Sequence, residues 1–169
     1  MLSKNRVIQL LVDKLPTVAV KAVPFVPQAF SQLTIEHALN YFFKQELSAG
    51  LLNFMQQRSV QITVTDLPFS FYVSGQVKRG NFYLAVSHNL ATADVALAGS
   101  MNDLFLLMTQ YVDPDTLFFR RRLTLRGDTE LGLELKNFLD TIELQTRLPN
   151  SVHQWSLDIA GALAERQPL

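Results

Sequence analysis

A stretch of alternating apolar and polar residues begins at Val60 and constrains the fold more than any other feature of the chain. Val60, Ile62 and Val64 alternate with polar neighbours, and the same alternation continues from Phe69 to Val77. A period of two sends successive side chains to opposite faces of a β-strand, so that one face is apolar and the other polar. The pattern predicts a half-buried antiparallel sheet.

Turn residues divide this region into strands. Asp66-Leu67-Pro68 separates the first two strands, and Arg79-Gly80-Asn81 makes a tight turn into the third. A fourth strand is expected around Val95 and Leu97, and four strands in succession predict a meander. A fifth strand is predicted over Leu117–Arg126, where apolar and basic residues alternate.

Apolar residues at helical spacing flank and interrupt the predicted strands. One helix is expected from Ser31 to Gly50, because glycine commonly ends a helix. Ser100 and Asp128 precede two further periodic runs, and both residue types cap helix N-termini. The second of these runs predicts a helix over Thr129–Leu144. The order of elements predicts an α+β fold with a five-stranded, mostly antiparallel sheet covered by helices and enclosing an apolar cavity.

Shorter segments flank this domain at both ends. Near the start, an apolar stripe at helical spacing stops at Pro16, and Val-Pro-Phe-Val-Pro follows as an extended tether. We expect an amphipathic helix and its tether over residues 1–30, the main domain over residues 31–145, and a C-terminal helix packed on that domain over residues 146–169.

The composition excludes several kinds of chemistry. The chain has no cysteine, which excludes disulfides and thiolate metal sites, and its 15 basic residues balance its 15 acidic ones. No net field therefore attracts nucleic acid. The three histidines, His37, His88 and His153, lie on different predicted elements without neighbouring metal ligands. We therefore expect that the protein is not an enzyme, that it has no catalytic residue, and that it binds no metal or cofactor.

Arginines 120, 121, 122 and 126 form the densest cluster of charge in the chain. On a strand, Arg120, Arg122 and Arg126 would share one face. That face is either a solvated surface balanced by nearby acidic residues or a docking surface for an anionic lipid headgroup or a partner protein, since the arginine fork suits phosphate and carboxylate.

The first segment is predicted to form a basic amphipathic helix. Its apolar stripe and one of its cations are Lys4, Val7, Ile8, Leu11 and Leu15. Such helices either pack on their own domain or lie on a membrane or a partner protein. Both alternatives stay open from the sequence.

The order of these elements resembles that of the sterol carrier protein 2 domain family. The residues that carry the resemblance are Asp94–Ser100, the helix that begins around Asp103-Leu104, and Leu123–Asp128 leading into Leu131 and Leu135. The resemblance covers about residues 31–145. It implies a domain that binds a lipid in an apolar interior.

Within that family, the Val-Pro-Phe-Val-Pro tether and the segment Phe118–Leu123 resemble bacterial accessory factors of oxygen-independent ubiquinone biosynthesis. This implies binding of isoprenoid quinone precursors or phospholipid in the cytoplasm, with peripheral contact at the inner membrane. It also implies cooperation with iron-sulfur hydroxylation proteins of the U32-peptidase-like family. The chain ends in Gln167-Pro168-Leu169, unlike the peroxisomal address of animal sterol carriers, which argues against sterol.

The candidate ligand contacts are apolar residues of the predicted sheet face and its covering helices. They are Phe71, Val73, Phe82, Leu84, Val95, Leu97, Leu104, Met108, Leu123, Leu125, Leu131 and Leu135. Core packing and ligand contact produce the same pattern, so each residue fits either role. An assembly or membrane-docking subunit without a resident ligand is the alternative function.

Overall fold

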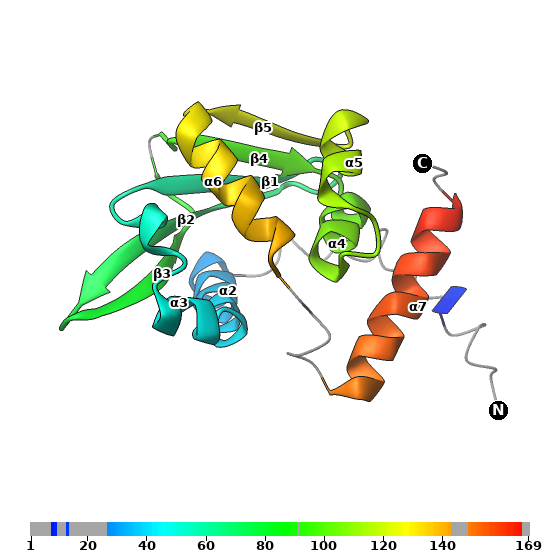
Figure 1. The fold of residues 1–169 in the computed structure, drawn as a ribbon, viewed down its shortest axis with the longest axis horizontal. Helices are drawn as coiled ribbons and strands as arrows, with labels where there is room; N and C mark the ends of the chain where they lie inside the picture. Colours follow the sequence, from blue (N-terminus) through cyan, green and yellow to red (C-terminus); the bar gives the residue numbers. More distant parts are fainter. Residues whose placement is uncertain (1–7, 10–12, 14–26, 91, 143–148, 167–169) are drawn as a thin grey trace.

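A central mixed sheet organises the chain. The computed structural model describes residues 8–9, 13, 27–90, 92–142 and 149–166. The strands are β1 (Ser59–Val64), β2 (Phe69–Lys78), β3 (Asn81–Ser87), β4 (Val95–Gly99) and β5 (Leu123–Gly127), in the spatial order β3-β2-β1-β4-β5 (Figure 1). The β1–β4 pair is parallel and the other neighbouring pairs are antiparallel. The predicted five-stranded, mostly antiparallel sheet is confirmed.

The first three strands form the expected meander. Arg79 and Gly80 connect β2 to β3 with positive φ angles of 52° and 79°, the backbone that a two-residue hairpin turn requires. The expected continuation into a fourth meander strand is wrong, because β4 pairs with β1 and places Val95 opposite Val60. Alternation along a strand fixes which face is buried but not which strand lies beside it.

Helices surround the sheet on several sides. They are α2 (Gln28–Phe42), α3 (Lys44–Ala49), the 3-10 helix η2 (Asn53–Met55), α4 (Met101–Thr109), α5 (Pro114–Phe119), α6 (Thr129–Asp140) and α7 (Asn150–Arg166). In Figure 1, α6 crosses the sheet, α2 lies beside β3, and α7 packs on α4 away from the sheet. The sheet is therefore covered as predicted.

The helix expected from Ser31 to Gly50 is two helices. α2 begins at Gln28, so the extended tether predicted to reach residue 30 is wrong over its last three positions, 28–30. Phe43 separates α2 from α3, and Gly50 ends α3 with a φ of 74°. The glycine stop is confirmed, because this left-handed conformation is one that glycine adopts without strain.

Both predicted helix caps are present. The Ser100 hydroxyl accepts a hydrogen bond from the Asp103 backbone N–H at 3.1 Å and donates one to the Asp103 carboxylate at 2.6 Å. The Asp128 carboxylate accepts a hydrogen bond from the Leu131 N–H at 2.9 Å. These bonds satisfy N–H groups that the first helical turn leaves without an internal partner. α6 ends at Asp140 rather than Leu144.

The first half of the predicted fifth strand is a helix. Asp113 caps α5 by accepting a hydrogen bond from the Thr116 N–H at 3.0 Å, and Pro114 occupies the first helical position. This proline-started helix includes Leu117–Phe119, and β5 begins only at Leu123. The strand predicted over Leu117–Arg126 is thus wrong over residues 117–122 and right over Leu123–Arg126.

An unusual C-terminal cap explains that error. The Arg121 N–H donates to the Phe118 carbonyl and the Arg122 N–H donates to the Leu117 carbonyl, each at 3.0 Å, while Arg121 has a φ of 59°. This is the Schellman arrangement, in which glycine normally takes the left-handed position. Arginine stands there instead, so the sequence carries no helix stop.

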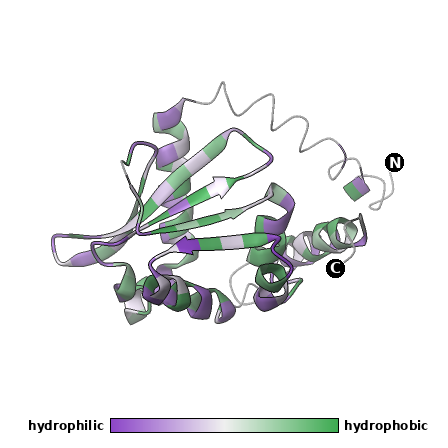
Figure 2. Cartoon of the chain, turned by 90° about the horizontal axis from the view of Figure 1, so that it is seen from above, coloured by the Kyte–Doolittle hydropathy of each residue, from purple (hydrophilic) through white to green (hydrophobic). Residues whose placement is uncertain are grey.

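The core lies between the sheet and the helices that cover it. Figure 2 shows hydrophobic and hydrophilic bands alternating along the strands. The largest fully buried side chains are Leu106, Leu117, Leu123, Leu131 and Val95. Burial of one such leucine contributes about 2 kcal/mol, so this layer accounts for much of the cohesion between α4, α5, α6 and the sheet.

Candidate functional site

The strand residues expected to line a ligand site share one face of the sheet. Val60 lies opposite both Val73 and Val95, and Leu97 lies opposite Leu125. Paired residues of neighbouring strands project to the same side. The residues of the predicted set on this apolar face are Phe71, Val73, Phe82, Leu84, Val95, Leu97, Leu123 and Leu125.

Helices press closely on this apolar face. A Cβ atom at Gly75 would lie 2.4 Å from the Met55 carbonyl oxygen, and one at Gly132 would lie 2.9 Å from the Leu125 side chain. Only glycine allows η2 to approach β2 so closely, because the close atoms at Gly75 belong to the backbone, whereas at Gly132 the Leu125 side chain would have to shift. The apolar face and these helices together form the interior of the domain.

The predicted residues differ in how tightly they are packed. Leu131 is fully buried on α6, whereas Leu104 and Leu135 are half-buried against the core. Met108 is 58% exposed and lies on the surface of α4, so in this structure it lines no interior space. Contact of these residues with a ligand stays a prediction.

A cluster of phenylalanine rings extends the interior beyond the predicted set. The Phe138 ring centroid lies 5.4 Å from that of Phe43 and 6.0 Å from that of Phe54, and Phe42 stacks edge-on to Phe43. These rings come from α2, η2, α6 and the residue between α2 and α3. The sequence contains twelve phenylalanines, but contacts between residues so distant in sequence leave no local signal that would identify these four.

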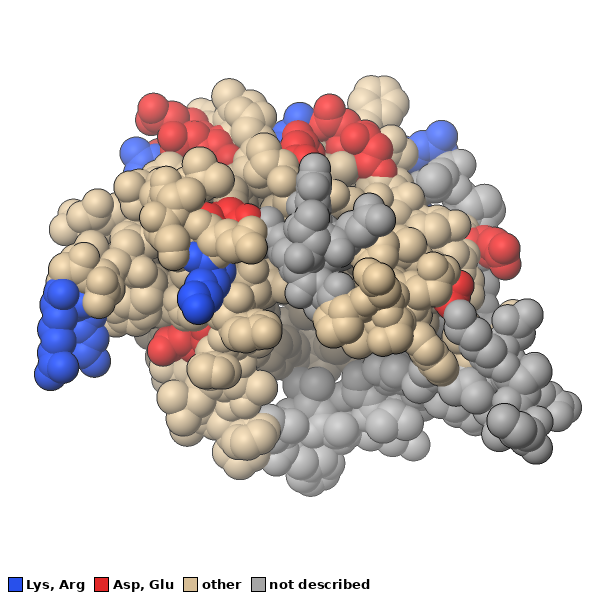
Figure 3. All heavy atoms as spheres, turned by 60° about the horizontal axis from the view of Figure 1, so that its bottom comes forward, with Lys and Arg blue, Asp and Glu red and all other residues tan. Residues whose placement is uncertain are grey.

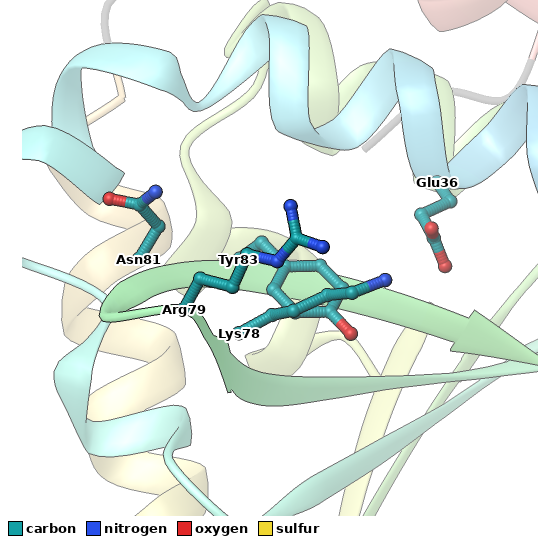
Figure 4. A pocket seen from close by; sticks show the side chains of 5 residues that line it. All are labelled: Glu36, Lys78, Arg79, Asn81 and Tyr83. Atoms are coloured by element: carbon teal, nitrogen blue, oxygen red, sulfur yellow. The ribbon is translucent and has the colours of Figure 1, made fainter.

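A polar depression lies between α2 and the β2–β3 hairpin. It has a volume of about 440 Å³ and is lined by Glu36, Lys78, Arg79, Asn81 and Tyr83. Figure 4 shows Lys78 and Arg79 lying beside the Tyr83 ring, with Glu36 reaching down from α2. The Glu36 carboxylate accepts a hydrogen bond from the Val86 N–H at 2.8 Å, so it fixes α2 on β3. This polar hollow offers little to an apolar chain.

A second depression runs along the outer edge of β5. It has a volume of about 480 Å³ and is lined by Phe118, Arg121, Leu123, Thr124, Leu125, Arg126 and Lys136. Leu123 and Leu125 belong to the predicted lining set, and the three cations were not part of it. A lining that combines apolar and basic side chains suits an amphipathic anion better than a neutral hydrocarbon.

Of the three histidines, His88 makes structural contacts. His88 Nε2 lies 2.9 Å from the Ser31 hydroxyl and His88 Nδ1 lies 3.0 Å from the Ser70 carbonyl oxygen. These contacts tie the start of α2 to β2. Within residues 27–90, 92–142 and 149–166, together with the few described before them, no group of three or more His, Asp or Glu side chains could hold a metal ion.

Among the described residues, two carboxylates have shifted pKa values. Hydrogen bonds from Ser59, first its backbone N–H and then its hydroxyl, lower the pKa of Asp94. Loss of hydration raises the pKa of Asp140, and the nearby Asp115 adds to that effect. A hydrogen bond to Asp115 raises the pKa of Lys136, which keeps this ammonium charged beside the second depression. None of these three groups sits within the apolar interior.

The predicted basic ridge does not form as one strand face. Arg122 turns inward, where its Nε donates to the Asp103 carboxylate at 2.6 Å and a terminal nitrogen of the same fork lies 2.5 Å from that oxygen. Arg120 follows the end of α5 and Arg126 lies on β5. The ridge is wrong because α5 replaces the strand, so Arg122 stabilises the fold while Arg120 and Arg126 stay exposed.

The expected N-terminal helix lies mostly outside the described residues. Lys4, Val7, Leu11 and Leu15 belong to that part. Ile8 is described and is only 5% exposed, within the main hydrophobic core. At this one position the structure agrees with packing on the domain, and the choice between packing and membrane or partner contact otherwise stays open.

Comparison with known proteins decides the family. Residues 35–140 match the model of the SCP-2 sterol transfer family. The chain belongs to this family. It is 38% identical over 157 residues to the ubiquinone biosynthesis accessory factor UbiT of Escherichia coli strain K12, a match that covers 93% of this chain and 84% of that protein. The protein of the same name from E. coli O157:H7 matches equally well.

A solved structure of the SCP-2 type supports the fold. The UbiJ-SCP2 ubiquinone synthesis protein superposes with a TM-score of 0.54 at 16% identity, covering 68% of this chain and 97% of that one. The resemblance inferred from the order of elements is confirmed, and so is the α+β fold class.

The surface of this family member is largely uncharged on one side. Figure 3 shows a broad area of uncharged side chains, with basic side chains at the left edge, where the β2–β3 hairpin lies. In the described part of the chain, no helix combines the length and the apolar character needed to cross a bilayer.

Proposed function

We propose that this protein is a non-catalytic lipid carrier that acts as an accessory factor in ubiquinone biosynthesis. The observation that carries the proposal is its 38% identity, over 93% of the chain, to the E. coli accessory factor. Its cargo is an isoprenoid quinone precursor or a phospholipid, which it presents to iron-sulfur hydroxylation proteins of the U32-peptidase-like family in the oxygen-independent route. It works in the cytoplasm and at the surface of the inner membrane.

The packing of the interior supports a place for the cargo. Val95 and Leu97 are 1% and 5% exposed and already fill their part of the apolar face. Phe71, Leu104 and Leu135 are only half-buried, so the cargo enters among them and beside the phenylalanine cluster. Each buried methylene of a prenyl or acyl chain contributes about 0.8 kcal/mol, and a long chain therefore binds without any charged contact.

A bulky substitution on α6 tests where the cargo lies. Leu135→Trp fills the half-buried space next to the apolar face, and we expect the purified variant to carry several-fold less extractable lipid than the wild type. Leu133→Trp is the matched control, because Leu133 lies on the same helix and is 58% exposed. The measurement is organic extraction and mass spectrometry of the purified full chain. Equal lipid content in both variants would contradict this site.

One observation favours the alternative function as an assembly subunit without a resident ligand. Both depressions described above open to the surface, and charged side chains line each of them. The same extraction separates the two functions. Lipid that co-purifies with the wild type supports the carrier, and wild-type protein free of lipid would leave only the assembly role.

A further inference from the structure

The end of α5 exposes a large aromatic side chain. Phe119 is 90% exposed, more than any other large hydrophobic residue among those that the structure describes. Single exposed apolar residues are common on protein surfaces. Phe119 differs in its setting, because Arg120 and Arg121 follow it directly and both are exposed.

The cap of α5 holds these arginines in place. Hydrogen bonds from the backbone of Arg121 and Arg122 to Phe118 and Leu117 close the helix end. Beyond the cap, Arg122 is drawn inward to Asp103. Arg120 and Arg121 stay at the surface beside Phe119, where the position of their backbone is fixed by the cap rather than by a loose loop.

The cations around Phe119 have no acidic partner in the part of the chain that the structure describes. Within the described residues, no carboxylate forms an ion pair with Arg120, Arg121 or Arg126. Asp113, Asp115 and Asp140 interact with Lys136 instead, and Asp115 pairs with it. Two of these uncompensated charges, Arg121 and Arg126, therefore line the second depression, and apolar side chains line it as well.

We propose that Phe119, Arg120, Arg121 and Arg126 form a docking surface for an anionic lipid bilayer. Phe119 enters the boundary between headgroups and acyl chains, and the arginines face the lipid phosphates. Charge complementarity selects this partner, because uncompensated arginines around an exposed aromatic ring match a surface that is negative outside and apolar beneath. The proposal rests on the carrier function, since a carrier that exchanges lipid must meet a membrane.

Vesicle binding by the full chain tests the docking surface. We expect co-sedimentation with phosphatidylcholine vesicles that contain one third phosphatidylglycerol, much weaker binding to phosphatidylcholine alone, and weakening with added salt. The double variant Arg120→Gln, Arg121→Gly should bind the anionic vesicles about thirtyfold less tightly, given the usual contribution of each of the two cations near such a surface. Glycine suits the left-handed position, so the cap of α5 is preserved.

The chain offers a matched control for this double variant. Lys78→Gln, Arg79→Gly removes the same charge from the β2–β3 hairpin, where Arg79 also has a positive φ, of 52°. This control should bind vesicles like the wild type. Equal losses in both double variants, or no loss in either, would overturn the proposal, and so would binding to neutral vesicles that matches binding to anionic ones.

The aromatic anchor has its own pair of variants. Phe119→Ser should lower vesicle affinity about tenfold through lost apolar burial, whereas Leu33→Ser, at a residue 67% exposed on α2, should not. Unchanged affinity in Phe119→Ser would exclude insertion. The same surface could instead mediate contact between protein chains. If light scattering shows that the wild type self-associates, that the Phe119 and arginine variants are smaller, and that vesicle binding is the same in all of them, the membrane proposal fails. Lipid content measured by extraction stays independent, so failure of docking is distinguishable from failure of the carrier function.

Discussion

The two edges of the sheet end in different ways. At the β3 edge, the Asn40 side chain donates to the Leu84 carbonyl at 2.7 Å and accepts from the Leu84 N–H at 3.0 Å, and Glu36 accepts from the Val86 N–H. These side chains of α2 take the place of a further strand. At the β5 edge, β4 is the one hydrogen-bonding partner of the strand within the described residues.

The difference shows two solutions to one physical problem. An unpaired edge can recruit other chains, and proteins blunt it either by covering it or by placing charges on it. β3 is covered, which removes it from contact with partners. At β5, the cations Arg121, Arg126 and Lys136 line an open depression. Their charges discourage pairing with another strand but leave the surface accessible. The accessible edge is the one beside the proposed docking surface.

The largest expected effect concerns the support of the β5 edge. Arg122→Ala leaves the Asp103 carboxylate, 9% exposed in its side chain, without its cation. Loss of one partner of a buried ion pair costs about 3 kcal/mol or more. Urea denaturation should show this loss in the free energy of unfolding, because the pair joins α4 to the segment that enters β5.

Arg120→Ala is the control for this prediction. Arg120 is exposed and is not paired with any described acidic residue, so its removal should change stability by less than about 0.5 kcal/mol. Equal effects of the two substitutions would mean that the Arg122–Asp103 pair contributes nothing beyond surface charge, and that β5 is held by apolar packing alone.

The sequence was informative wherever a local rule applies. Period two located β1, β2 and β3, and the capping residues Ser100 and Asp128 located the starts of α4 and α6. It was misleading at α5, because Arg121 takes a left-handed position without the glycine that normally marks it.

Contacts between distant segments were beyond the reach of such rules. The parallel pairing of β4 with β1 depends on the segment between β3 and β4, which crosses to the other side of β1, and not on the residue pattern of either strand. The candidate site shows the same division. Alternation placed the strand residues on one face, but Phe43, Phe54 and Phe138 come close only when the α2–α3 junction, η2 and α6 pack together.

The second prediction opens the covered edge. Asn40→Ala removes two hydrogen bonds to Leu84 and leaves a backbone N–H and carbonyl of β3 unpaired, which costs about 2 kcal/mol. We expect lower stability in urea and concentration-dependent self-association by size-exclusion chromatography, because the edge becomes available for pairing. His37→Ala, on the exposed side of the same helix, should leave both properties unchanged. A monomeric Asn40→Ala protein of wild-type stability would show that α2 covers β3 by apolar contacts alone.

The smallest effect lies between the two edges, where β1 meets β4. The Asp94 carboxylate accepts hydrogen bonds from the Ser59 N–H at 2.7 Å and the Ser59 hydroxyl at 2.9 Å, and these bonds hold the pKa of Asp94 below its ordinary value of 3.8. A lowered pKa in the folded state means that the ionised carboxylate stabilises the fold above pH 3.8 and that this contribution disappears as the pH falls through the lowered pKa. Asp94→Asn should therefore cost about 1 kcal/mol at neutral pH.

The pH dependence of this variant separates charge from shape. Urea denaturation at a series of pH values should show the gap between wild type and Asp94→Asn shrinking below pH 3.8, because protonation then removes the same charge from the wild type. A gap that stays constant into acid would mean that the amide fails for reasons of geometry. In that case β1 and β4 are held together by backbone hydrogen bonds, like β5 on β4. They do not depend on a side chain that bonds to the backbone, as β3 does on Asn40.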